Sequence, residues 1–180
     1  ATSENKIVTS ELKKKALEHF IAGSTFEAKG DYAGAILEFQ DALRIDPSAG
    51  VHYALAKNYL FLNRLPLALQ HGKKSVELDS SVADYYDLLA DIFSATRQYD
   101  SAAVVLEKLL LIDSSRFNSY YKLARIYETS KPLKAISIYE KLTTIVGSEW
   151  TILVRVAELY EQLGRTDDAI NTIEELLIID

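Results

Sequence analysis

The chain has 180 residues but no cysteine and no methionine, and only three prolines, seven glycines and one tryptophan. Without cysteine it has no disulfide, no thiolate metal ligand and no cysteine nucleophile. The lack of methionine at position 1 indicates a processed chain or a segment of a longer protein. No apolar signal segment and no Ser/Gly-rich linker is present in the sequence, so we expect one continuous domain.

The chain also has fewer basic than acidic residues, with 20 Lys and Arg and 26 Asp and Glu, so its net charge is −6. The one basic run is Lys13, Lys14 and Lys15, which we interpret as a solvated helix face, with a binding patch as the alternative. Phosphate binding needs clustered positive charge, so we expect no nucleic-acid partner. The longest apolar stretches are far shorter than a bilayer span, so we also expect no membrane insertion.

Small and aromatic residues recur along the chain every 33 or 34 residues. The first small column is Gly23, Ala56, Ala90, Ala124 and Ala157; the aromatics three residues later are Phe26, Tyr59, Phe93, Tyr127 and Tyr160; a second small column is Ala35, Ala68, Ala102, Ala135 and Ala169. A small residue and an aromatic one turn apart share a helix face, where a neighbouring helix can approach closely. Three columns repeated five times indicate a repeat protein made of helical hairpins.

The first unit shows where its two helices begin and end. Gly30 and Asp31 predict a stop and a cap between them, and Pro47 predicts the end of the second. The string Ala22-Gly23, Phe26, Gly30-Asp31-Tyr32, Ala35, Phe39, Ala42-Leu43, Asp46-Pro47 resembles the tetratricopeptide repeat. The other units keep this skeleton, but Gly72 stands where the family has a large apolar residue, and the family's tryptophan is absent.

The resemblance implies an all-α fold, a right-handed α-α superhelix (solenoid) of five tetratricopeptide-like hairpins. We expect repeats at about 16–48, 49–82, 83–116, 117–149 and 150–180. They would form a single domain at 10–180, preceded by a flexible polar lead-in at 1–9.

The sequence carries no recognisable catalytic or metal-binding pattern. His19, His52 and His71 have no partner at metal-binding helical spacing, and no glycine-rich phosphate loop is present. We interpret His19 and His52 as packing residues and His71 as partly exposed. One acidic column, Asp46, Asp79, Asp113 and Asp180, marks the turns between repeats. We therefore expect no active site, no cofactor and no metal.

By resemblance to the family, the first helices of the hairpins line a concave groove that binds a partner. The candidate groove residues are Phe20, Tyr53, Lys57, Phe61, Asp87, Asp91, Tyr121, Arg125 and Glu158. Four of them alternate in sign, which fits either a ladder of salt bridges between repeats or a charged groove floor. The four aromatics Phe20, Tyr53, Phe61 and Tyr121 are either binding anchors or packing residues.

The resulting hypothesis is a non-catalytic scaffold that binds a protein or peptide, with a recruiting module of a larger enzyme or secretion or assembly component as the alternative. The Lys, Arg and Asn set with which one subgroup of the family grips a terminal carboxylate is missing. Because Asp84, Asp87 and Asp91 make the middle of the groove acidic, we expect a peptide with a basic or aromatic centre. Ile170, Ile173 and Leu177 predict an exposed apolar strip, open to continuation of the array, self-association or docking of another protein.

Overall fold

A computed structural model describes residues 3–147 and 149–179, whose regular structure is α-helical throughout. The helices in chain order are α1 (Ser3–Ala28), α2 (Tyr32–Ile45), α3 (Ala49–Phe61), α4 (Leu65–Leu78), α5 (Ala83–Ala95), α6 (Tyr99–Ile112), α7 (Phe117–Ser130), α8 (Pro132–Val146), α9 (Trp150–Gln162) and α10 (Thr166–Ile179). The predicted all-α class is confirmed.

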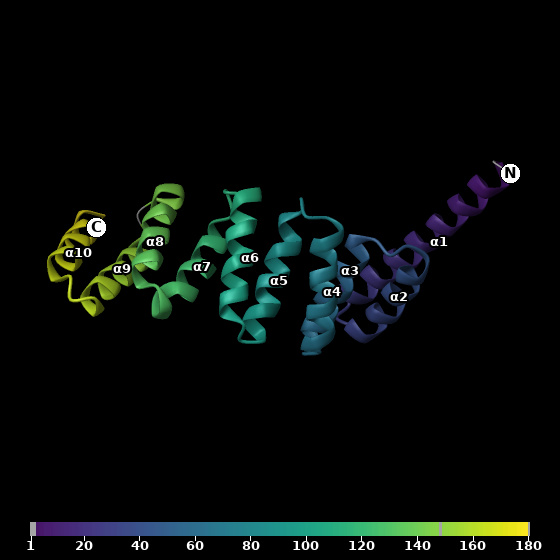
Figure 1. Ribbon diagram of the computed structural model, residues 1–180, viewed down its shortest axis with the longest axis horizontal. Helices are drawn as coiled ribbons and strands as arrows, with labels where there is room; N and C mark the ends of the chain where they lie inside the picture. Colours follow the sequence, from purple (N-terminus) through teal and green to yellow (C-terminus); the bar gives the residue numbers. More distant parts are fainter. Residues whose placement is uncertain (1–2, 148, 180) are drawn as a thin grey trace. The chain divides into compact units, whose positions relative to one another are not determined.

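The helices form two compact units, residues 1–98 and residues 99–180. In the first unit α1 packs on α2 and α3 on α4, and α5 then packs against α4 (Figure 1). In the second unit α7 packs on α8 and α9 on α10, with α6 against α7. This serial packing of helical hairpins is a helical-repeat solenoid fold, as the column spacing predicts. The single domain at 10–180 stays a prediction.

Turn chemistry fixes the hairpin of the first repeat. Gly30 has φ 78°, a left-handed conformation that suits glycine, and Asp31 caps α2 by accepting a hydrogen bond from the backbone N–H of Gly34 at 2.8 Å. The helix ends at Ile45, two residues before Pro47. The sequence signals for this stop, cap and end are therefore correct.

The first helix extends into the predicted lead-in at 1–9, whose flexibility stays a prediction. The helix α1 begins at Ser3 and runs for 26 residues, so the backbone of residues 3–9 is helical. The physical reason is that no glycine or proline occurs before Gly23 to interrupt the helical hydrogen bonds. Residues 1 and 2, and Asp180 of the acidic column, lie outside the described residues.

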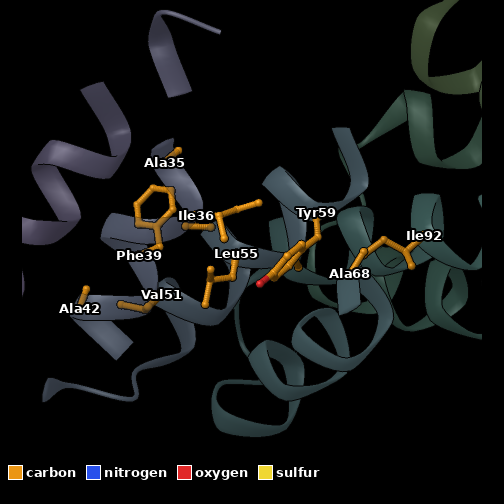
Figure 2. Close-up of a cluster of buried hydrophobic side chains, with 11 residues drawn as sticks. Ala35, Ile36, Phe39, Ala42, Val51, Leu55, Tyr59, Ala68 and Ile92 are labelled. Carbon is orange, nitrogen blue, oxygen red and sulfur yellow. The ribbon is translucent and has the colours of Figure 1, made fainter. Parts of the chain in front are cut away.

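The small columns allow close helix packing. All five alanines of the second column are buried, and so are Gly23, Ala56, Ala90, Ala124 and Ala157 of the first. In the first unit α2 and α3 share a hydrophobic cluster that includes Ile36, Phe39, Val51 and Leu55 (Figure 2). The aromatic column is less uniform, because Phe26 is 37% exposed whereas Tyr59, Phe93 and Tyr127 are buried.

Two glycines in this core lie close to apolar side chains of neighbouring helices. A Cβ atom on Gly23 would lie 2.7 Å from Cε1 of Phe39, so the phenyl ring occupies the space that alanine fills in the other repeats. A Cβ atom on Gly72 would lie 3.0 Å from Cδ1 of Ile92 and 3.4 Å from Cδ1 of Leu89. The side chains of α5 thus fill the place where the family has a large residue, which explains the departure at Gly72.

Candidate binding groove

A groove of about 340 Å³ opens between α3 and α5 in the first unit. Its lining residues are Tyr53, Lys57, Leu60 and Phe61 from α3 and Asp84, Asp87, Leu88 and Asp91 from α5. Residues three or four apart share a helix face, so each helix presents one face to the groove. Five of the nine candidate residues, namely Tyr53, Lys57, Phe61, Asp87 and Asp91, therefore lie together.

The two aromatic side chains of the groove, Tyr53 and Phe61, each pack against a second aromatic ring. The ring of Tyr53 lies 5.1 Å from that of Tyr85, at an interplanar angle of 36°. The ring of Phe61 stacks on Tyr32 at 4.6 Å and 7°, yet 57% of the residue remains exposed. Phe61 thus packs on Tyr32 while more than half of the residue stays exposed, and its role as a binding anchor stays a prediction. Burial raises the pKa of Tyr53, so its phenol stays neutral at physiological pH.

The two supporting rings, Tyr32 and Tyr85, were not among the candidate groove residues. Tyr32 belongs to the Gly30-Asp31-Tyr32 string of the first unit, so the repeat pattern contained a signal for it. Tyr85 occupies no recurrent aromatic position, so no sequence signal pointed to it. The positions of both depend on how α2 and α5 pack beside α3, which is a property of the tertiary structure.

The polar side of α3 is tied to α1. Lys57 Nζ lies 2.6 Å from Oε1 of Glu27, and Asn58 Nδ2, on a fully buried side chain, donates to Oε2 of the same carboxylate at 2.6 Å. The hydrogen bond to Glu27 is the main cause of the raised pKa of Lys57. This ammonium group is therefore charged and held in place beside the groove.

The opposite wall of the groove is acidic. Asp84, Asp87 and Asp91 follow one another at spacings of three and four residues along the α5 face. Their carboxylates share this wall with the apolar side chain of Leu88, while Leu60 and Phe61 contribute from α3. The arrangement joins an apolar floor to negative charge, a combination that favours cationic and aromatic groups.

The remaining candidates lie elsewhere. Phe20 is partly buried, with its ring 5.3 Å from that of Phe39, so the packing interpretation holds for this residue. In the second unit, Tyr121 makes an edge contact with Tyr139 at 5.9 Å and is 43% exposed. Arg125 is exposed on α7, and Glu158 accepts a hydrogen bond from Arg155 Nη1 at 2.6 Å.

Two members of the alternating column, Lys57 and Glu158, form ion pairs with residues outside the column. Lys57 pairs with Glu27, and Glu158 pairs with Arg155. In the second unit Arg155 in α9 links two repeats, because its Nε donates to Oε1 of Glu128 in α7 at 2.9 Å. Charged links between first helices therefore exist at Lys57 and Arg155, and the ladder along the whole column stays an interpretation.

The histidines occupy contacts between paired helices. His19 Nδ1 lies 2.8 Å from Glu38 Oε2, and His52 Nδ1 lies 2.9 Å from His71 Nδ1. Burial is the main cause of the lowered pKa of both His52 and His71. Among the described residues, no group of three or more carboxylate and imidazole side chains could hold a metal ion. No helix in this part of the chain is both long and apolar enough to cross a membrane.

Serial helical hairpins, packed through small residues and bearing a groove on their first helices, define a helical-repeat protein. Family models described as tetratricopeptide repeat match residues 19–48, 83–116 and 152–180. The chain belongs to the tetratricopeptide repeat family, and it is a protein–protein interaction module.

Solved structures of similar proteins agree with this assignment. A crystal structure of MamA is 25% identical, with 91% of each chain covered and a TM-score of 0.82. YrrB, titled a TPR protein with an unusual peptide-binding site, is 14% identical over 100% of this chain and 94% of its own, with a TM-score of 0.80. The first TPR of Spaghetti (RPAP3), bound to the HSP90 peptide SRMEEVD, is 21% identical over 65% of this chain and 96% of its own, with a TM-score of 0.62. No curated protein matches the chain.

Proposed function

We propose that the chain is a non-catalytic scaffold that binds a peptide segment of a partner protein in the groove between α3 and α5. The observation that carries this proposal is the convergence of Tyr53, Lys57, Phe61, Asp87 and Asp91 on one hollow of about 340 Å³. These residues come from two helices and are separated by up to 38 positions in the sequence (53 to 91). The peptide-binding titles of YrrB and Spaghetti (RPAP3) support a ligand of this class.

The aromatic rings are suited to act as anchors. Tyr53 and Phe61 are supported by Tyr85 and Tyr32 respectively, so little side-chain entropy is lost when a ligand covers them. Exposed rings on a rigid support supply a large contact area, and aromatic residues are enriched among the positions that dominate binding energy. The ligand would therefore insert an apolar or aromatic side chain between α3 and α5.

Charge selects among such ligands. The α5 wall carries Asp84, Asp87 and Asp91, and the whole chain has a net charge of −6. A peptide with a basic or aromatic centre complements this wall, whereas an acidic peptide is repelled. The same charge balance disfavours a nucleic-acid partner, because no basic cluster faces the groove.

The proposal assigns no chemistry to the groove. Its lining contains no histidine, serine or threonine, and its one lysine is already bonded to Glu27. The polar groups present can orient a peptide by charge and hydrogen bonds, but they form no nucleophile and base pair. Binding is thus the activity that these side chains support best.

A peptide array tests the proposal. We would probe it with the labelled chain, using peptides with basic-aromatic centres, neutral peptides and the acidic-tailed SRMEEVD. We expect the basic-aromatic class to bind best, and Tyr53→Ala and Phe61→Ala each to weaken binding by about tenfold. Tyr99→Ala is the matched control, since Tyr99 is 52% exposed and does not line the groove. Preferential binding of SRMEEVD, or equal loss with Tyr99→Ala, would refute the proposal.

A further inference from the structure

The outer face of α10 is apolar and exposed. Ile170 is 49% exposed, Ile173 47% and Leu177 75%, as the strip in the sequence predicts. The repeat register makes Ile36 and Phe39 of α2 equivalent to Ile170 and Ile173, since each pair lies one and four residues after the second small column. In α2 the same positions are only 7% and 1% exposed.

The equivalent residues of α2 and α8 are buried because the first helix of the next repeat covers this face. In the first unit α3 packs against α2 and adds Val51, Ala54 and Leu55 to the cluster that buries Ile36 and Phe39 (Figure 2). In the second unit α9 packs against α8, where the equivalent Ile136 and Tyr139 are 3% and 0% exposed. The surface that fits this face is therefore the first helix of a following hairpin.

At α10 the corresponding space is an open groove of about 440 Å³. Its floor is apolar, with Val154 and Ala157 from α9 and Ala169, Ile170 and Ile173 from α10, and it also includes the carboxylates of Glu158 and Glu161. Exposed apolar grooves of this kind mark interaction sites.

A matching helix exists in the chain itself. Ile21 and Ala22 of α1 stand 33 residues before Ala54 and Leu55, so they hold the positions with which α3 covers α2. Ile21 and the neighbouring Leu17 are each 56% exposed. The helix α1 thus presents apolar residues, Ile21 and Ala22, at two of the three positions with which α3 covers α2, whereas Glu18 stands at the position of Val51.

We propose that copies of this chain associate head to tail, with α1 of one copy occupying the α9–α10 groove of the next. The contact continues the junction seen between α2 and α3, with Ile21 and Ala22 covering Ile170 and Ile173 and the exposed Leu17 one turn away on α1. It is heterologous, because each copy uses two different surfaces, so copies add in series as the concentration rises. The α3–α5 groove takes no part in this contact, and the two proposals succeed or fail separately.

One polar position refines the contact. Glu161 is the equivalent of Glu27, which binds Lys57 and Asn58 of the following first helix. In α1 the equivalents of Lys57 and Asn58 are Ser24 and Thr25, which carry no charge and whose hydroxyls donate to the carbonyl oxygens of Phe20 and Ile21. Ser24→Lys would recreate the ion pair of the internal junction and should tighten association. The same substitution in a Glu161→Gln background should not.

Analytical ultracentrifugation over a concentration series tests the proposal through complementary variants. Ile21→Asp removes the α1 surface and leaves the α10 groove, whereas Ile173→Asp does the reverse. We expect the wild type to form a concentration-dependent series of oligomers, each variant alone to be monomeric, and a mixture of the two to form a one-to-one dimer. Leu111→Asp, at a position that is 88% exposed on α6, is the control and should associate like the wild type.

The outcomes are distinct. The one-to-one dimer shows that both monomeric variants are folded, because each contributes an intact surface. A wild type that stays monomeric throughout, or an Ile21→Asp variant that dimerises alone through two α10 faces, would overturn the proposal.

Discussion

The Nδ1 atoms of His52 in α3 and His71 in α4 lie 2.9 Å apart, so one imidazole donates a hydrogen bond to the other. Only a neutral ring can be the acceptor, and two imidazolium rings would direct protons at each other. Tyr59 stacks on His71 at 5.6 Å, and Lys74 and Glu77 are the charged groups that act on His52. The hairpin of α3 and α4 is thus joined by a pair that is stable only when at least one member is unprotonated.

This pair predicts a loss of stability on acidification. The pKa of both histidines is lowered in the folded chain, chiefly by burial, so the unfolded chain binds more protons as the pH falls below about 6.5. The free energy of unfolding should therefore decrease between about pH 7.5 and about pH 5.5. Urea titrations followed by circular dichroism at the two pH values measure the change.

The control is a His52→Gln/His71→Gln double variant, which retains amide hydrogen bonding but does not titrate. Its urea midpoint should depend less on pH over the same interval than that of the wild type. An equal pH dependence in both proteins would show that the pair contributes nothing to it.

Gly23 and Phe39 provide a test of packing between α1 and α2. Alanine at position 23 would place Cβ 2.7 Å from Cε1 of Phe39, so we expect Gly23→Ala to cost about 1–3 kcal/mol in spite of its better helix propensity. A double-mutant cycle with Phe39→Leu, analysed by urea unfolding, should show a smaller cost for Gly23→Ala when the ring is absent.

Gly50→Ala is the matched control within a helix. Its Cβ would lie 3.7 Å from Tyr85 Oη, an ordinary contact, so we expect a change of about 0.4–1 kcal/mol in the stabilising direction. Strict additivity in the Gly23 and Phe39 cycle would contradict the packing account.

These contacts show what the sequence could and could not predict. The period of 33 or 34 residues, the cap at Asp31 and the proline at position 47 were sufficient for the helices and their hairpins, because these signals are local. The column pattern also predicted five residues of one groove. It did not distinguish Phe20, which packs on Phe39, from Phe61, which is open, because their exposure depends on neighbouring helices.

The sequence pattern also did not predict which residues form the ion pairs. Lys57 and Arg155 both reach back to a carboxylate of the preceding first helix, Glu27 and Glu128 respectively. The two cations stand at different positions of the repeat, three residues apart in register, so no single column contains both. Their choice of partner is set by the three-dimensional offset between helices.

Two arginines of the second unit therefore differ in their contribution to stability. Arg155→Ala leaves the Glu128 side chain, which is only 12% exposed, with Tyr139 as its remaining hydrogen-bond donor, so we expect a cost of about 1–3 kcal/mol. Arg125 is exposed and, among the described residues, makes no ion pair. We expect Arg125→Ala to change stability by less than about 0.5 kcal/mol in the same urea assay. Equal costs for the two substitutions would contradict this assignment.

The most direct test of peptide binding between α3 and α5 is amide hydrogen exchange of the wild-type chain, with and without the tightest peptide from the array. The account predicts slower exchange in α3 around Tyr53 and in α5 around Asp87 when the peptide is bound, and no such change in the Phe61→Ala variant under the same conditions. Protection confined to other helices, with α3 and α5 unchanged, would contradict it.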